Sequence, residues 1–300
     1  GMLKYNPIAH LVLGWQAENT VKLIDDGNTI PFIARYRKEA TGSLDDQLLR
    51  ELNDRLNYLR SLKEQKEKII ASITEQEKMT DDIAKSIENA KTMTELEDIY
   101  RPFRPKRKTR ASVAKALGLE PLAEAIYAQE KGTPAPEILA EDYLTDEVPD
   151  IESALQGAKD IIAELVSDDP NGRKLIRYAV HNNGMLTSKG ADDNLGVYEM
   201  YKEYSEPVKS IAGHRVLAVN RGEKEGKLKV SIDFDKTIAT DLLFNIHCKN
   251  NTKATDLVIE AVEDSFSRLI FPSIEREIRN ELTDKACESS IKVFGENTRQ

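Results

Sequence analysis

The residues best suited to chemistry in this sequence are basic, and they gather in one short segment. Residues 101–110 read Arg-Pro-Phe-Arg-Pro-Lys-Arg-Lys-Thr-Arg, with six cations and no acidic residue. Lysine and arginine neutralise phosphates and release counterions, so such a cluster predicts contact with a nucleic-acid backbone. The two prolines favour an extended chain, which suits a segment that follows such a backbone. The predicted site consists of Arg101, Arg104, Lys106, Arg107, Lys108 and Arg110.

The same segment has a second interpretation, as a charged connector. Residues 116–170 hold fourteen acidic residues against two lysines, a local balance of −12. The cations of residues 101–110 would then form ion pairs with these carboxylates, or with another domain, in place of phosphates. The sequence leaves both interpretations open.

A second basic group lies in residues 30–46, which join a short apolar opening segment to the longest uninterrupted helical pattern. This secondary basic patch consists of Arg35, Arg37 and Lys38. Three apolar or aromatic residues lie among them, Phe32, Ile33 and Tyr36. We expect these three to pin the root of the long helix to its scaffold. The cations would then pair with acidic neighbours in preference to phosphate.

Enzyme chemistry finds little support in the other polar residues. The acidic pairs lie at expected helix starts or in loops, where capping explains them. The four histidines have no partner at a spacing that suits zinc, and there is no glycine-rich phosphate loop. Cys248 and Cys287 are far apart and are interpreted as structural thiols. We therefore predict a protein that is not an enzyme and uses no metal or cofactor.

Bulk composition restricts the class of protein. The 300 residues carry a net charge of −9, so any contact with a polyanion must come from a local patch. Hydrophobic residues make up 40% and charged residues 32%, which is typical of a soluble, helix-rich protein. The sequence lacks the long apolar run of a membrane span. With only two widely spaced cysteines, it fits a reducing compartment, and we predict a cytoplasmic protein.

Hydrophobic spacing predicts a mainly α-helical chain. A long helix is expected at about 44–77, with Ser43 as its capping residue and leucines and isoleucines at a spacing of three and four. Residues 228–234 alternate apolar and polar side chains and predict one minor strand or hairpin. We divide the chain into a discontinuous helical scaffold, 1–100 plus 206–300, and a helix-turn-helix-like helical domain, 101–205.

The helix-turn-helix-like pattern occupies residues 112–126, which read helix, glycine turn, helix. Its second helix carries Glu120 and Glu124, whose carboxylates oppose phosphate. We therefore interpret this unit as structural and do not expect it to read bases in a major groove.

Three further elements are expected from local signals. One is a short helix from Asn6-Pro7 to Trp15, and another runs from Ala254 to Phe271 and ends at Pro272. The third carries a core stripe of tyrosines at helical spacing, Tyr198, Tyr201 and Tyr204.

Several segments, taken in order, resemble the bacterial Tex family of transcription accessory proteins. They are Ile30–Glu39 with Thr41-Gly42, Leu96–Arg110, Gly118–Ala123, Asn220–Gly226 and Pro272–Glu277. The chain departs from the family before His214-Arg215, where Ala212-Gly213 replaces the usual Pro-Ser. The resemblance implies an N-terminal region, because Tex proteins continue into an RNase-H-like domain, a helix-hairpin-helix region and an OB-fold domain of the S1 type.

The resemblance also implies a function. It implies a protein that acts in transcription and binds RNA or DNA without being a known catalyst. Binding by this part should be weak, because the OB-fold is the family's main nucleic-acid-binding element. The implied partners are nucleic acid, the C-terminal domains of the same protein and the transcription machinery, with no membrane. The alternative function is a protein-interaction scaffold that positions those domains or docks on that machinery.

Overall fold

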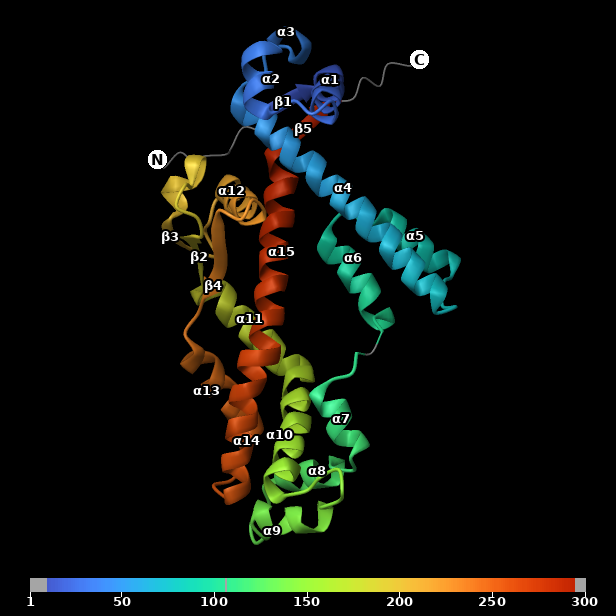
Figure 1. Ribbon diagram of the computed structural model, residues 1–300, viewed down its shortest axis with the longest axis vertical. Helices are drawn as coiled ribbons and strands as arrows, with labels where there is room; N and C mark the ends of the chain where they lie inside the picture. The colour runs from blue at the N-terminus through green and yellow to red at the C-terminus, as the bar shows by residue number, and fades with distance from the viewer. Residues whose placement is uncertain (1–9, 106, 295–300) are drawn as a thin grey trace, which may run out of the picture. The chain divides into compact units, whose positions relative to one another are not determined.

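The computed structural model describes residues 10–105 and 107–294 of the chain. The fold is mainly α-helical, as predicted, and it contains two small sheets where one strand or hairpin was expected (Figure 1). The chain forms two compact units. The first unit comprises Gly1–Arg104, Ala212–Lys227 and Asn280–Gln300, and the second comprises Pro105–Ile211 and Leu228–Arg279. The domain division made from the sequence stays a prediction, and these units differ from it in grouping 228–279 with 105–211.

The first unit is built from helices around one long helix. Its elements are β1 (His10–Leu13), α1 (Gly14–Asp25), α2 (Ile30–Tyr36), α3 (Lys38–Thr41), α4 (Asp46–Glu75), α5 (Asp81–Asn89), α6 (Met93–Tyr100), η1 (Arg101–Phe103), α12 (Gly213–Lys224), β5 (Ile291–Phe294) and the part of α15 (Phe271–Ser290) that begins at Asn280.

The long helix α4 was predicted correctly, but its cap was not. The side chain of Asp45 accepts a hydrogen bond from the backbone N–H of Leu48 at 2.8 Å, so Asp45 is the cap. Ser43 lies in a left-handed conformation with φ of 62°. Leu59 and Ile70, which the heptad spacing placed in one stripe, are 45% and 39% exposed. An α-helix drifts against a seven-residue repeat, so α4 uses different faces along its length.

Two separate hydrophobic clusters follow from that drift. The N-terminal half of α4 packs with the opening elements in a cluster of Val12, Ile33, Leu44, Leu49 and Leu52. The C-terminal half packs with α5 and α6 in a cluster of Leu62, Ile69, Ile73, Ile87, Ala90 and Leu96. The long helix therefore supports two packing groups within the first unit.

A strand replaces the helix that was predicted from Asn6-Pro7 to Trp15. Residues 10–13 form β1, which pairs in parallel with β5, with Val12 opposite Val293. Residues 6–9 lie outside the described residues. Local capping signals cannot reveal a strand partner some 280 residues away in the chain, so tertiary pairing overrides the local signal here.

Two residues of the segment Asn220–Gly226 make polar contacts within the first unit. The Arg221 guanidinium forms an ion pair with Asp54 of α4, whose side chain is only 8% exposed. Asn220 donates a hydrogen bond to the hydroxyl of Thr283 in α15 at 2.9 Å. Burial raises the pKa of Asp54 to about 6, although Arg221 acts in the opposite direction. These side chains therefore hold α12, α4 and α15 together.

The second unit combines a helical bundle with a three-stranded sheet. Its elements are α7 (Arg110–Ala116), α8 (Glu120–Ala128), α9 (Pro136–Ala140), η2 (Glu141–Tyr143), α10 (Ile151–Asp168), α11 (Pro170–Asn183), β2 (Met185–Gly190), η3 (Gly196–Tyr201), β3 (Glu203–Pro207), β4 (Leu228–Asp233), α13 (Lys236–His247), α14 (Lys253–Asp264), the π-helical η4 (Ser265–Ile270) and the first part of α15, to Arg279.

The predicted strand at 228–234 is confirmed as β4, although the sheet is larger than one hairpin. Its order is β3-β2-β4 and both pairs are antiparallel, with Leu186 opposite Ile232. Leu228, Val230 and Ile232 are buried, as the alternation predicted. Glu275 accepts a hydrogen bond from the backbone N–H of Ile232 at 3.1 Å, so a helix side chain satisfies part of the strand's outer edge.

Two local predictions in the second unit are wrong in detail. Pro272 does not end a helix, because η4 leads directly into α15 and the N–H of Phe271 bonds to the carbonyl of Phe266, five residues back. The widened turn sits just before the proline, whose ring would clash in a regular helix interior. Tyr198 and Tyr201 are buried as expected, but they lie in η3, while Tyr204 lies in β3.

Candidate nucleic-acid interface

The short helices α2 and α3 are built by local signals around residues 29–42. Thr29 caps α2, accepting a hydrogen bond from the backbone N–H of Phe32 at 3.4 Å. Gly42 ends α3 with φ of 63°, a left-handed conformation that favours glycine. A Cβ at Gly42 would also lie 2.8 Å from the ring of Trp15, so the turn packs tightly against α1. In Figure 1, α1, α2 and α3 lie together at the start of α4.

One face of α2 is buried and another is exposed. Ile33 is completely buried in the cluster at the N-terminal half of α4. Residues three and four apart share a helix face, and on the other side Phe32 is 38% exposed and Tyr36 is 59% exposed, with Arg35 also exposed. The expectation that all three apolar residues pin the long helix is therefore right only for Ile33.

The three cations of this segment are exposed, and no described residue is an acidic partner for them. Among residues 10–105 and 107–294, no carboxylate forms an ion pair with Arg35, Arg37 or Lys38. The expectation that they pair with acidic neighbours is therefore wrong for the described residues. The guanidinium of Arg37 lies 5.9 Å from the ring centroid of Phe32, a contact between a cation and an aromatic ring.

These side chains form a surface that we call the aromatic–basic patch. It consists of Phe32, Arg35, Tyr36, Arg37 and Lys38. The ring centroids of Phe32 and Tyr36 are 5.1 Å apart, with an interplanar angle of 47°. Glu39 is the only carboxylate between Ile30 and Thr41, so the local net charge is positive on a chain whose total is −9. Such a surface can offer positive charge to phosphates and ring faces to bases.

The first half of the basic decapeptide differs from the aromatic–basic patch, because its cations are already paired. In the first unit, Arg101 forms an ion pair with Asp98 at 3.1 Å, and Arg104 forms one with Glu97. The Arg104 guanidinium also lies 5.9 Å from the ring centroid of Tyr100. These partners come from α6, and not from the acidic stretch that the connector interpretation named.

The second half of the decapeptide begins the second unit. Arg107, Lys108 and Arg110 are exposed, and none of them forms an ion pair with a described residue. Lys106 lies outside the described residues. The decapeptide crosses the boundary between the two units, so the structure brings Arg101 and Arg104 together on one unit and the other three on the second. A single site formed by all six residues stays a prediction.

The helices α7 and α8 form the predicted helix, glycine turn, helix. The turn contains Gly118 with φ of 79°. On α8, Leu122, Ala123 and Ile126 are buried, whereas Glu120, Pro121 and Glu124 are exposed. The exposed carboxylates would repel phosphates, so this face does not support major-groove reading. A DNA-binding helix-turn-helix function stays untested.

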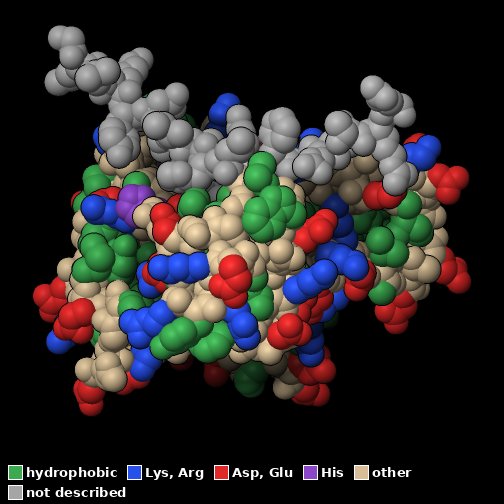
Figure 2. All heavy atoms as spheres, turned by 90° about the horizontal axis from the view of Figure 1, so that it is seen from above, with side chains coloured by type: hydrophobic (Ala, Val, Ile, Leu, Met, Phe, Trp, Pro, Cys, Tyr) green, Lys and Arg blue, Asp and Glu red, His purple; other side chains and the backbone are tan. Residues whose placement is uncertain are grey.

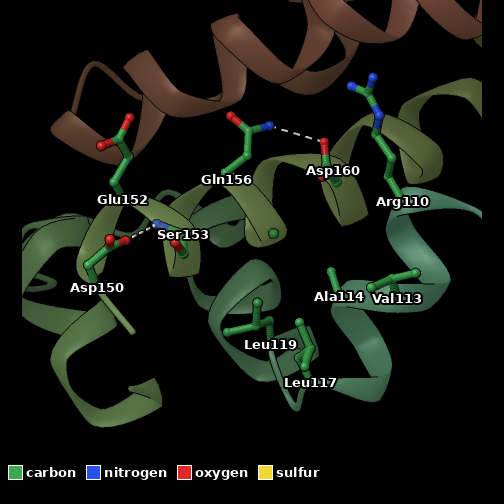
Figure 3. Close-up of a pocket in the computed structure, with 11 residues that line it drawn as sticks. Arg110, Val113, Ala114, Leu117, Leu119, Asp150, Glu152, Ser153, Gln156 and Asp160 are labelled. Atoms are coloured by element: carbon green, nitrogen blue, oxygen red, sulfur yellow. Dashed lines mark hydrogen bonds between the residues drawn. The ribbon is translucent and has the colours of Figure 1, made fainter. Parts of the chain in front are cut away.

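A pocket of about 520 Å³ lies between α7 and α10 (Figure 3). Its apolar lining includes Val113, Leu117 and Leu119. Figure 3 shows Arg110 and Asp160 at one side and the carboxylates of Asp150 and Glu152 at the other. The Asp150 carboxylate caps α10 by accepting a hydrogen bond from the backbone N–H of Ser153 at 2.7 Å, and its pKa is lowered by hydrogen bonds from Ser153.

Other polar residues serve the fold. Asp169 caps α11, and the buried His247 accepts or donates a hydrogen bond with the hydroxyl of Tyr127 at 2.9 Å. Burial lowers the pKa of His247. Within the described ranges, no group of three or more histidine, cysteine or acidic side chains is placed to hold a metal ion. None of the described helices is long and apolar enough to cross a bilayer.

The net charge of −9 does not attract polyanions to the molecule as a whole. On the face that Figure 2 shows, the described basic side chains are interspersed with acidic and hydrophobic ones and form no large field of one sign. Any phosphate contact must therefore be local, as the composition indicated. Sequence reasoning missed the exposure of Phe32 and Tyr36. The signal was available in their spacing of four residues on a helix whose other face carries Ile33.

Comparison with known families gives two matches that lie in the same order as the segments noted in the sequence. Residues 10–74 match the model of the Tex-like protein N-terminal domain. Residues 131–294, more than half of the chain, match the model of the Tex central region-like family.

Individual relatives agree with these matches. The chain is 46% identical over 292 residues to the uncharacterized protein YdcI of Bacillus subtilis, covering 94% of this chain and 40% of YdcI. It is 36% identical over 293 residues to the transcriptional accessory protein Tex of Neisseria gonorrhoeae, covering 95% and 38%. It is 30% identical over 309 residues to the human S1 RNA-binding domain-containing protein 1, covering 95% and 30%. The chain thus spans two fifths or less of the length of these relatives.

Proposed function

The chain belongs to the Tex family, and we propose that it is a non-catalytic, nucleic-acid-associated module of a transcription accessory protein. The observation that carries this proposal is a set of three exposed cations, Arg35 on α2, Lys38 on α3 and Arg37 between the two helices. None of them has an acidic partner among the described residues. Unpaired cations can bind phosphates without first giving up an ion pair.

The names of two relatives support a role with nucleic acid in transcription. One relative is named a transcriptional accessory protein and another an S1 RNA-binding domain-containing protein. Arg107, Lys108 and Arg110 are a second set of exposed cations, on the second unit, and we propose that they add phosphate contacts. Arg101 and Arg104 contribute less, because each is held by a carboxylate of α6.

The proposal is tested by measuring binding of the intact chain to single- and double-stranded oligonucleotides across a salt series. The variant Arg35→Ala/Arg37→Ala/Lys38→Ala removes the three unpaired cations. On a single strand each phosphate contact contributes about 0.7 to the slope of log affinity against log salt, so the variant should lose about 2 from that slope.

A matched control removes equal charge elsewhere in the same unit. Lys63, Lys78 and Lys85 are exposed and have no ion pair among the described residues, so their triple alanine variant has the same net charge as the test variant. It should keep most of the salt slope. Equal losses in the two variants, or no salt-sensitive binding by the unaltered chain at low salt, would contradict the proposal.

A second function, a protein-interaction scaffold, is favoured by one specific observation. The pocket between α7 and α10 has an apolar lining, with Arg110 and Asp160 at one side and the carboxylates of Asp150 and Glu152 at the other. This pattern suits an amphipathic segment of another protein or domain better than it suits a nucleic acid. The test is a pull-down in which this chain retains a C-terminal region of a Tex-family protein. Loss of that retention in the Val113→Asp variant would support the scaffold function. Retention that the substitution leaves unchanged would contradict it.

A further inference from the structure

The aromatic–basic patch exposes two rings that the fold does not need for its core. Phe32 and Tyr36 are 38% and 59% exposed, while Ile33 beside them fills the core position of the same helix. Large aromatic side chains on a surface mark contact sites when they lie side by side. The two rings are neighbours, with centroids 5.1 Å apart.

The charged residues around the two rings indicate which class of molecule would bind over them. Three cations that form no ion pair with a described residue lie within five residues of the rings, against one carboxylate, Glu39. An apolar protein partner would have to bury these cations, which costs free energy unless the partner is acidic. A nucleic acid supplies both groups in one molecule, because phosphates alternate with flat bases at every nucleotide. Charge complementarity therefore favours a nucleic acid over a protein.

The rings also discriminate between forms of nucleic acid. In a duplex, the faces of the bases are stacked on one another, and a helix surface can reach only the backbone and the groove edges. In a single strand, base faces are open and can stack on phenylalanine or tyrosine. Exposed rings beside unpaired cations therefore favour a strand whose bases are unpaired.

We infer that the aromatic–basic patch is a stacking platform for single-stranded nucleic acid. Phe32 and Tyr36 take one or two unpaired bases on their ring faces, while Arg35, Arg37 and Lys38 hold the flanking phosphates. This inference rests on the proposed function, since the cations supply the phosphate contacts, and it adds the preference for single strands. RNA and DNA share the recognised groups, so both are included in the test.

The test replaces the rings while keeping the charge and most of the apolar volume. The variant Phe32→Leu/Tyr36→Leu is compared with the unaltered chain for binding to a fluorescent single strand of uridines, a single strand of thymidines, a duplex, and an abasic strand with the same number of phosphates. Base stacking contributes about 1–3 kcal/mol per base. Affinity for both base-bearing single strands should fall about 5- to 150-fold, with duplex and abasic binding unchanged.

Three outcomes separate the inference from the proposed function. If base-bearing and abasic strands bind the unaltered chain equally, stacking is wrong while phosphate binding stands. If the double leucine variant weakens duplex and single-strand binding equally, stacking is also wrong. If no strand binds in a salt-dependent way, the proposed function fails. A difference in affinity between the uridine and thymidine strands shows whether the platform prefers RNA or DNA.

A second variant guards against loss of folding. Tyr36→Trp retains a stacking ring and reports on its surroundings, because stacked bases quench tryptophan fluorescence. It is made with Trp15→Phe so that position 36 carries the only tryptophan. Quenching by single strands, and much weaker quenching by the duplex and the abasic strand, supports the platform; equal quenching by all four contradicts it.

Discussion

The ion pair of Arg221 with Asp54 allows a quantitative prediction about what holds the first unit together. Asp54 has an 8% exposed side chain and Arg221 a 30% exposed one. Burial raises the pKa of Asp54 to about 6 even with Arg221 present. The variant Arg221→Met keeps much of the aliphatic contact but removes the charge. The carboxylate of Asp54 must then stay ionised without its partner or take up a proton.

Proton uptake sets an upper limit to the electrostatic loss. A group with a folded pKa of about 6 is protonated at pH 8 at a cost of about 2.7 kcal/mol, and at pH 6 at a cost of about 0.4 kcal/mol. Because the folded pKa lies above the unfolded value, the stability contributed by protonated Asp54 is lost as pH rises through about 6. We therefore expect Arg221→Met to lower the free energy of unfolding by up to about 3 kcal/mol at pH 8 and by about 1 kcal/mol or less at pH 6.

The assay is urea unfolding at both pH values, followed by tryptophan fluorescence. Trp15 is the only tryptophan of the chain and lies in the same unit as Asp54 and Arg221, so its emission reports that unit. Arg60→Met is the control, because the pair of Arg60 with Asp25 is about half exposed on both sides and should cost less than about 1 kcal/mol at either pH. Equal losses from Arg221→Met at pH 6 and pH 8 would refute the reasoning.

Two further changes test how the aromatic–basic patch is supported. Gly42→Ala should destabilise the first unit by about 1–2 kcal/mol, because φ is 63° there and the added Cβ would crowd Trp15; thermal unfolding measures this, and an unchanged midpoint would contradict it. Ile33→Ala should cost about 2–5 kcal/mol, whereas Phe32→Ser/Tyr36→Ser should cost less than about 1 kcal/mol per residue, because only Ile33 is fully buried. Comparable losses in the urea assay would show that the rings support the core after all.

The elements that were predicted correctly are determined by the residues within a short stretch of sequence. The helix α4 and the strand β4 have uninterrupted periodic patterns, so their positions follow from local spacing. Elements that depend on residues elsewhere in the chain, or on irregular helix geometry, were missed. The strand β1 depends on β5, and the helix through Pro272 depends on a widened turn just before the proline. Neither cause is visible in a periodic pattern.

For the candidate site, too, the sequence predicted what depends on residue types and missed what depends on three-dimensional contacts. Sequence composition located both basic segments, because cations are read directly from residue types. It could not say which cations are paired, because the partners depend on side-chain geometry. The decapeptide has more charge, yet Arg101 and Arg104 are held by Asp98 and Glu97, whereas the cations of the aromatic–basic patch form no ion pair with a described residue. Pairing therefore removes the decapeptide's advantage in charge, because Arg107, Lys108 and Arg110 are its only cations without an ion pair among the described residues, the same number as in the aromatic–basic patch.

The ion pairs of Arg101 and Arg104 lead to one more prediction, in which binding of nucleic acid becomes tighter. If the carboxylates of α6 hold Arg101 and Arg104 back from phosphate, then Glu97→Gln/Asp98→Asn should release them. An exposed ion pair contributes up to about 1 kcal/mol, which corresponds to about fivefold in affinity per arginine, and each released cation can add about 0.7 to the salt slope on a single strand. The measurement is the same salt series with a single-stranded oligonucleotide.

The control for this variant must change the net charge equally. Glu67→Gln/Glu88→Gln removes two exposed carboxylates of the first unit that form no ion pair with a described residue. General electrostatics alone would tighten binding to the same small degree in both variants and would leave the slope unchanged. A steeper slope only in Glu97→Gln/Asp98→Asn would show that release of arginines increases phosphate binding. Equal behaviour of the two variants would mean that the ion pairs with Glu97 and Asp98 do not limit phosphate binding by the decapeptide, so that only the aromatic rings would distinguish the aromatic–basic patch from it.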